Sequence, residues 1–80
     1  MIVEKDNFEK DIHLLLSDTV KELVVRFNKP ASEAEWLVEK SDMKNIIAEK
    51  PIALHDSAYK WATKLLTENG DIETLERYLV

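Results

Sequence analysis

The residues that could do chemistry are few, and the most reactive-looking pair is His55-Asp56. A histidine beside a carboxylate can act as a general base or a metal ligand. A metal site needs three or four converging ligands, and His13 is the only other histidine in the chain. We therefore interpret Asp56 as a helix cap and His55 as a buried hydrogen-bonding residue. Catalysis or metal binding by the pair is the alternative hypothesis.

A second set of reactive groups falls in the N-terminal third of the chain. Ser17 and His13 are four residues apart, so they would be neighbours on a helix. The serine has no glycine elbow and no obvious oxyanion hole. We interpret Ser17-Asp18-Thr19, with His13 one turn back, as the polar side of a helix. The sequence therefore predicts a protein that is not an enzyme, with no catalytic residue, no metal site and no cofactor.

The aromatic residues favour binding to another protein. Trp61 belongs to an apolar stripe with helical spacing, so we expect it in the core. Trp36 and Tyr59 lie off their stripes, and exposed tryptophan and tyrosine are common anchors at interfaces. Tyr78 is a further aromatic residue of the same candidate surface. The predicted interaction residues are Trp36, Tyr59, His55 and Asp56.

The elements that must position these residues are expected to be helices. The chain has 80 residues, of which 45% are hydrophobic and 34% charged, as in an ordinary globular domain. One glycine and two prolines are too few for the frequent turns of a β fold. We predict an all-α fold, a compact single-domain bundle of four to five helices spanning residues 1–80.

The longest predicted helix runs over residues 8–28, is capped by Asp6 or Asn7, and ends before Pro30. Leu14 and Leu15, with Val24 and Val25, widen its apolar face, which suggests packing on more than one side. The inner residues of this helix and of the later ones predict a core of Phe8, Ile12, Leu16, Val20, Leu23, Phe27, Leu37, Ile46, Ile47, Leu54, Trp61, Leu65 and Leu75.

Shorter helices follow. Ser32 and Glu35 match a capping box for a helix over residues 33–40. Ser41-Asp42 would end it and cap a third helix of about two turns, and residues 52–54 would form a buried connector. Asp56 or Ser57 would cap a fourth helix, whose apolar stripe is Ala58, Trp61, Ala62, Leu65 and Leu66. Gly70 suits the end of that helix, and Asp71 would cap a last short one with Ile72, Leu75 and Leu79 on one side.

The charge balance disfavours polyanionic partners. The net charge is −5, with no block of basic residues, which opposes binding to nucleic acid or to an anionic membrane surface. The acidic residues Glu68, Asp71, Glu73 and Glu76 could meet a basic partner or simply face solvent. With no cysteine, no signal peptide and no membrane-spanning stretch, the sequence predicts a cytoplasmic protein.

One nucleic-acid hypothesis stays open as the alternative function. The two short helices around Ser41-Asp42 could form a helix-turn-helix, and the protein would then be a DNA-binding regulator. The would-be recognition helix, DMKNIIAEK, carries two acidic residues against two lysines, and the turn has no glycine. A reader helix usually presents arginine, lysine, asparagine or glutamine to the bases, so the pattern is a poor match.

Ala34, Ser41 and Leu54-His55 follow one another at spacings of an Ala-x6-Ser-x13-His pattern. With the segments EAEWLVEKS, MKNII and ALHDSAYKWATKLL, the chain resembles a family of small uncharacterised bacterial helical proteins, over roughly residues 8–68. It departs from the family pattern at residues 51–53, where members carry an aromatic residue before Leu-His, and in its tail from residue 71 on. The family has no established catalytic residues. The resemblance implies an antitoxin or accessory-partner role.

The sequence thus predicts an interaction module. Its partner would be another protein or a second copy of itself, engaged through an apolar patch that contains aromatic residues and is bordered by acidic ones.

Overall fold

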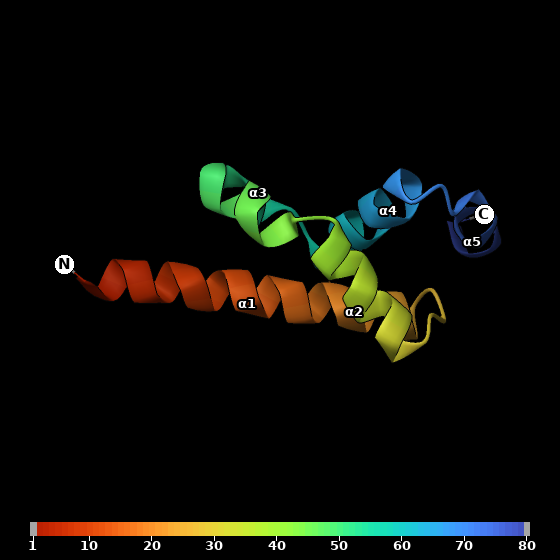
Figure 1. Ribbon diagram of the computed structural model, residues 1–80, viewed down its shortest axis with the longest axis horizontal. Coiled ribbons are helices and arrows are strands. Elements are labelled where there is room, and N and C mark those ends of the chain that lie inside the picture. The colour runs from red at the N-terminus through yellow and green to blue at the C-terminus, as the bar shows by residue number, and fades with distance from the viewer. Residues whose placement is uncertain (1, 80) are drawn as a thin grey trace.

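The computed structural model describes the backbone of residues 2–79 and the side chains of residues 8–77. It confirms the predicted all-α bundle, and residues 2–79 contain no strand (Figure 1). The elements are α1 (Ile2–Val25), α2 (Ala31–Lys40), α3 (Met43–Glu49), the 3-10 helix η1 (Pro51–His55), α4 (Ala58–Glu68) and α5 (Ile72–Leu79).

The long helix α1 is the element on which the others pack. It contacts α2, α3, η1 and α4, whereas α5 contacts α4 alone among these elements. Figure 1 shows α1 along one side of the molecule, with its N-terminal turns extending past α3. At a rise of about 1.5 Å per residue its 24 residues span about 36 Å, most of the 46 Å length of the molecule. Part of α1 therefore has few neighbours in this chain.

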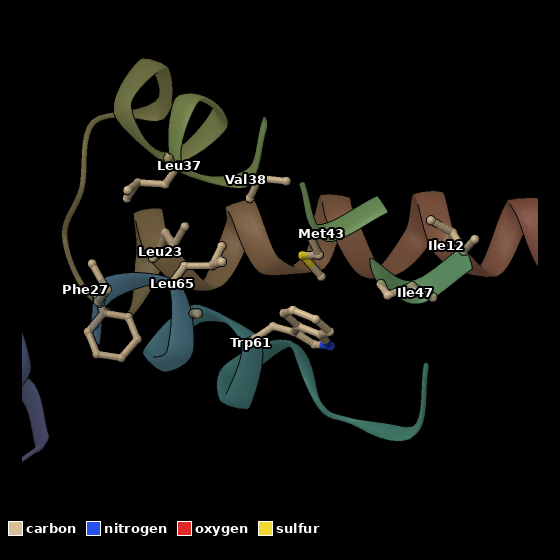
Figure 2. Packing of buried hydrophobic residues seen from close by; sticks show 12 residues of the cluster. Ile12, Leu23, Phe27, Leu37, Val38, Met43, Ile47, Trp61 and Leu65 are labelled. Atoms are coloured by element: carbon tan, nitrogen blue, oxygen red, sulfur yellow. The ribbon is translucent and has the colours of Figure 1, made fainter. Parts of the chain in front are cut away.

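The hydrophobic core lies between α1 and the layer formed by α2, α3 and α4. Figure 2 shows Leu37 of α2, Met43 of α3 and Trp61 of α4 gathered around the part of α1 that carries Ile12 and Leu23. Ile46 was predicted to be in the core and instead lies on the exposed side of α3, so that prediction was wrong. The other predicted core residues are buried or pack against the buried ones. The fully buried set is Ile12, Leu23, Phe27, Ala34, Leu37, Val38, Met43, Ile47, Trp61, Ala62, Leu65 and Leu66.

The predicted ends of α1 were wrong. The backbone is already helical at Ile2, so neither Asp6 nor Asn7 caps it. The helix ends at Val25, three residues before the predicted end. Asn28 has φ 55°, and the Lys29 N–H donates to the Leu23 carbonyl at 3.0 Å. Asparagine tolerates this left-handed conformation better than other residues with a side chain, so the chain turns before Pro30 is reached.

The predicted capping box of α2 was also wrong. The helix begins at Ala31, and its N-cap is Pro30, with no side-chain cap. The Pro30 carbonyl accepts the first helical bond, from the Ala34 N–H at 2.9 Å. Ser32 therefore lies inside the first turn and cannot cap it. The helix therefore starts one residue before the predicted cap.

The joint between α2 and α3 was predicted correctly at Ser41. Its hydroxyl donates to the Val38 carbonyl at 2.7 Å and accepts from the Met43 N–H at 3.2 Å. One serine thus satisfies groups at the end of α2 and the start of α3. Asp42 has φ 60°, and its carboxylate accepts from the Asn45 side chain at 2.7 Å instead of capping the backbone.

The ends of α4 follow the sequence closely. Ser57 caps its start and accepts from the Lys60 N–H at 3.1 Å, which settles the choice between Asp56 and Ser57. Gly70, at φ 73°, follows its end. The Asp71 N–H donates to the Leu66 carbonyl at 2.9 Å and the Gly70 N–H to the Thr67 carbonyl at 3.0 Å, the two bonds of a Schellman motif. Asp71 then caps α5 by accepting from the Thr74 N–H at 3.2 Å.

The connector before α4 is a 3-10 helix and not a buried extended segment. Ala53 and Leu54 pack against the core, but Ile52 is 76% exposed, so the prediction that residues 52–54 are all buried was wrong. A 3-10 helix has three residues per turn, and neighbours within one turn point in different directions. The Trp61 indole N–H donates to the Ala53 carbonyl at 3.3 Å and ties η1 to α4.

No helix among residues 2–79 is both long enough and apolar enough to cross a membrane.

Candidate binding surface

A groove runs between α1 and η1, and we call it the α1–η1 groove. Its α1 side carries Asp11, Leu14, Leu15 and Asp18, and its η1 side carries Pro51, Leu54 and His55. The four residues of α1 follow one another at spacings of three, one and three, which places them on adjoining rows of one helix face. The proline at the first position of η1 starts that helix directly after α3 and so aligns it beside α1.

The inside of the groove is apolar. Leu15 and Leu54 are half-buried against the core. Leu14 is 61% exposed, and Ile52, next to Pro51 in η1, is 76% exposed. Within the groove, Leu14, Leu15 and Leu54 thus present apolar side chains that a partner could cover. Their side chains would each contribute about 1.5–3 kcal/mol if a partner buried them fully.

The rim of the groove is acidic. Asp11 and Asp18 are exposed, and neither has an ion pair among the side chains of residues 8–77. At about 1.5 Å per residue their positions are about 10.5 Å apart along α1. The groove therefore presents two negative charges on either side of an apolar centre.

The predicted pair His55-Asp56 does not act on a common site. His55 is exposed and lines the α1–η1 groove, so the expectation that it is a buried hydrogen-bonding residue was wrong. The Asp56 side chain lies against α4 and not in the groove. Its carboxylate lies 3.4 Å from the Lys60 ammonium, and it borders a shallow depression along α4 with Trp61 and Lys64. The backbone turn between η1 and α4 separates the two side chains.

Tyr59 lies at the start of α4, against the end of α1. Its ring stacks on Phe27 with centroids 6.1 Å apart, and the Arg26 guanidinium stands 4.9 Å from its centroid. Glu22 holds that guanidinium through a 2.7 Å ion pair. Glu22 follows Asp18 by one turn on the same face of α1. The contact of Tyr59 with Arg26 therefore lies beyond the C-terminal end of the groove, toward the end of α1. At 38% exposed, Tyr59 is accessible, as predicted.

Trp36 is a separate feature on α2. It is 51% exposed, as predicted, and the Lys40 ammonium lies 4.6 Å from its ring centroid. Lys40 also reaches the Asn69 side-chain oxygen at 3.5 Å. The contacts of Trp36 thus point toward the end of α4, away from η1. Of the four predicted interaction residues, His55 lines the α1–η1 groove, and Trp36, Tyr59 and Asp56 do not.

The other candidate sites for chemistry lie on the surface. His13, Ser17 and Asp18 are exposed on α1, as expected for its polar side. Thr19 was predicted on the same polar side, and that prediction was wrong, because Thr19 is buried and its hydroxyl donates to the Leu15 carbonyl at 2.7 Å. Within the described residues no group of three or more histidine, aspartate or glutamate side chains could hold a metal ion. The side chains of Tyr78 and Leu79 lie outside the described residues.

No sequence pattern predicts the group of charges around Lys29, which we call the Lys29 cluster. The Lys29 ammonium pairs with the Asp71 carboxylate and with Glu33, the latter at 3.1 Å. Burial alone would lower the pKa of Lys29, but hydrogen bonds to Asp71 and Glu33 outweigh it and raise that pKa. The hydrogen bond from Lys29 lowers the pKa of Asp71 against the opposing effect of burial. The cluster ties the α1–α2 loop to the start of α5.

The residues of the α1–η1 groove were only partly visible in the sequence. Leu14 and Leu15 stood out as widening the apolar face of α1, which was the one signal for the groove. Asp11, Asp18 and Pro51 carried no such signal, because the partner element of the groove is some 35 residues further along the chain.

The fold and the groove define an all-α protein with an open surface groove, partly apolar and partly acidic, beside its longest helix. Comparison with protein-family models, with curated proteins and with solved structures gives no significant match. The resemblance to small bacterial helical proteins therefore stays a prediction, as does a cytoplasmic location.

Proposed function

We propose that this protein is a non-enzymatic interaction module that binds another protein through the α1–η1 groove. The observation that carries the proposal is an open groove in which the exposed side chain of Leu14 on α1 faces the same space as Leu54 of η1. A surface of this kind gains free energy when a partner covers it, because apolar area leaves water. The resemblance described above suggests an accessory-protein or antitoxin role for such a module.

The contacts of both groove walls with the core support the same proposal. The Trp61 indole donates a hydrogen bond to Ala53 of η1, and Ile12 of α1, next to Asp11, is buried in the core. A preformed surface loses little conformational entropy when it binds, so more of the apolar contact free energy appears as affinity. Tyr59, beyond the C-terminal end of the groove, offers an aromatic contact with a polar tip.

The test is capture of partners from the protein's own cell lysate by the tagged full chain, followed by mass spectrometry. The Leu14→Gln variant removes the apolar contact in the groove. Val25→Gln is its matched control, since Val25 is also exposed on α1 but does not line the groove. We expect a protein retained in stoichiometric amount by the wild type and the control and lost by Leu14→Gln.

Three results would overturn the proposal. One is retention of no protein by the wild type, with the chain monomeric at high concentration. Another is a partner held equally well by all three variants, which would move the binding surface elsewhere. The third is capture of duplex DNA, confirmed by a low-salt anisotropy titration, which would favour the DNA-binding regulator instead.

A further inference from the structure

The α1–η1 groove also defines the chemistry of its occupant. We propose that it takes an amphipathic helix of another protein in which two basic residues, seven positions apart, flank two adjacent apolar residues. The inference rests on the proposed function and names the class of partner that the function leaves open.

The spacing on α1 carries the geometric part of the argument. Asp11, Leu14, Leu15 and Asp18 form the pattern Asp-x-x-Leu-Leu-x-x-Asp, and all four line the groove. A helix laid along α1 has the same rise of about 1.5 Å per residue, so the pattern Lys-x-x-Leu-Leu-x-x-Lys matches it in register. The carboxylates and the leucines then meet opposite charges and apolar side chains at the same time.

The negative charge of the groove indicates that the partner helix is positively charged. Asp11 and Asp18 are unpaired among the described side chains, whereas Glu22 and Asp56 each pair with a base four residues away. Other exposed carboxylates, such as Glu35 and Glu39 of α2, are also unpaired. What distinguishes the two aspartates is that an open apolar groove lies between them, so a basic partner gains ion pairs and apolar burial together.

A second copy of this chain is a poorer occupant. Its net charge is −5, so two copies repel each other on approach. No pair of adjacent apolar residues in the sequence has a lysine or arginine both three positions before it and three positions after it. The described surface therefore presents no match to its own groove.

The experiment is an NMR titration of the ¹⁵N-labelled full chain with a synthetic helical peptide that contains Lys-x-x-Leu-Leu-x-x-Lys. The control peptide carries glutamate at both lysine positions. We expect amide shifts to cluster at residues 11–18 and 52–55 with the lysine peptide and no binding of the glutamate peptide. The amides of α2 and α5 should not move.

Two double variants that have the same net charge as each other test the role of the groove carboxylates. We expect Asp11→Asn with Asp18→Asn to weaken binding of the lysine peptide about tenfold at low salt, from two partly exposed ion pairs. Glu35→Gln with Glu39→Gln removes the same number of charges from α2 and should change the affinity by less than about twofold. In about 0.5 M salt the difference between the two double variants should vanish, because screening removes it.

Equal weakening by the two double variants would show a non-specific charge effect and overturn the inference. So would shifts spread over the whole surface, or concentration-dependent broadening at the groove without peptide, which would place a second copy there. If a lysate partner is captured through Leu14 but binds the Asp11→Asn, Asp18→Asn variant undiminished, this inference fails and the proposed function stands. If no partner is captured while the peptide binds as described, the proposed function fails instead.

Discussion

The α1–η1 groove and the Lys29 cluster both place two carboxylates at a junction between elements, and they differ in how those charges are balanced. In the Lys29 cluster, Glu33 and Asp71 share one largely buried ammonium. In the groove, Asp11 and Asp18 stand beside exposed apolar side chains, and no base among the described residues pairs with them. Carboxylates neutralised inside the chain stabilise its fold, whereas carboxylates left unpaired beside apolar surface are available to a partner.

The largest expected change in stability comes from comparing a residue on the buried face of α1 with a residue on its groove face. Leu23 is fully buried, so Leu23→Ala should lower the free energy of unfolding by about 2–5 kcal/mol through lost burial and the cavity it leaves. Leu14→Ala, on the same helix, should change it by less than about 0.5 kcal/mol. Urea unfolding followed by circular dichroism measures both. Similar losses for the two variants would mean that Leu14 is a stabilising residue and not a free surface.

The Lys29 cluster provides the next largest effect. Asp71→Asn keeps an acceptor for the Thr74 N–H but removes the charge that Lys29 pairs with, and we expect a loss of about 1–2 kcal/mol at pH 7. Asp18→Asn is the matched control and should leave stability within about 0.5 kcal/mol of the wild type.

The pH dependence of the same variant follows from the two pKa shifts. The pKa of Asp71 is lowered from its ordinary 3.8, so its contribution is complete above pH 3.8 and is lost as the pH falls through the lower folded value. The pKa of Lys29 is raised from 10.5, so its contribution is complete below pH 10.5 and is lost as the pH rises through the higher folded value. The gap between wild type and Asp71→Asn should therefore be constant in between and close in acid. A gap that persists well below the folded pKa of Asp71 would contradict an electrostatic origin.

A smaller effect concerns the turn that delivers Asp71 to the cluster. Gly70 has φ 73°, and a Cβ added there would meet no atom within 4 Å. Gly70→Ala should thus cost only the conformational penalty of a left-handed residue, about 1 kcal/mol. Gly70→Asn should cost less, because asparagine tolerates that conformation. Thermal unfolding of the two variants gives the order, and an equal loss in both would point to a cause other than backbone strain.

The smallest effect tests an ion pair beside the groove. Glu22 and Arg26 are one turn apart and partly exposed, so Glu22→Gln should lower stability by less than about 0.5 kcal/mol, an effect that salt abolishes. Comparing this loss of stability with that of Asp71→Asn contrasts the solvated Glu22–Arg26 ion pair with the largely buried Lys29–Asp71 pair. A loss as large as that of Asp71→Asn would show that the Arg26–Tyr59 contact, which Glu22 orients, contributes to the fold.

Local signals in the sequence predicted much of the fold. The apolar stripe of α4 correctly predicted that Trp61, Leu65 and Leu66 are in the core, because helical spacing alone decides which residues share a face. Ser57, Gly70 and Asp71 were predicted at helix ends, where each acts on backbone groups within five residues. The predicted start of α2 failed because the capping-box pattern of Ser32 and Glu35 matched the sequence, whereas the helix begins at Ala31 with Pro30 as its N-cap.

The sequence by itself determined an acidic, all-α chain, the core faces of its helices and most of their ends, since these depend on residue type, net charge and contacts within a turn or two. The tertiary structure alone decided the rest. It set η1 beside α1 to form the groove, turned His55 and Asp56 apart, and brought Asp71 to Lys29 across 42 residues. Such contacts depend on how helices cross in three dimensions, and no spacing along a single chain encodes that directly.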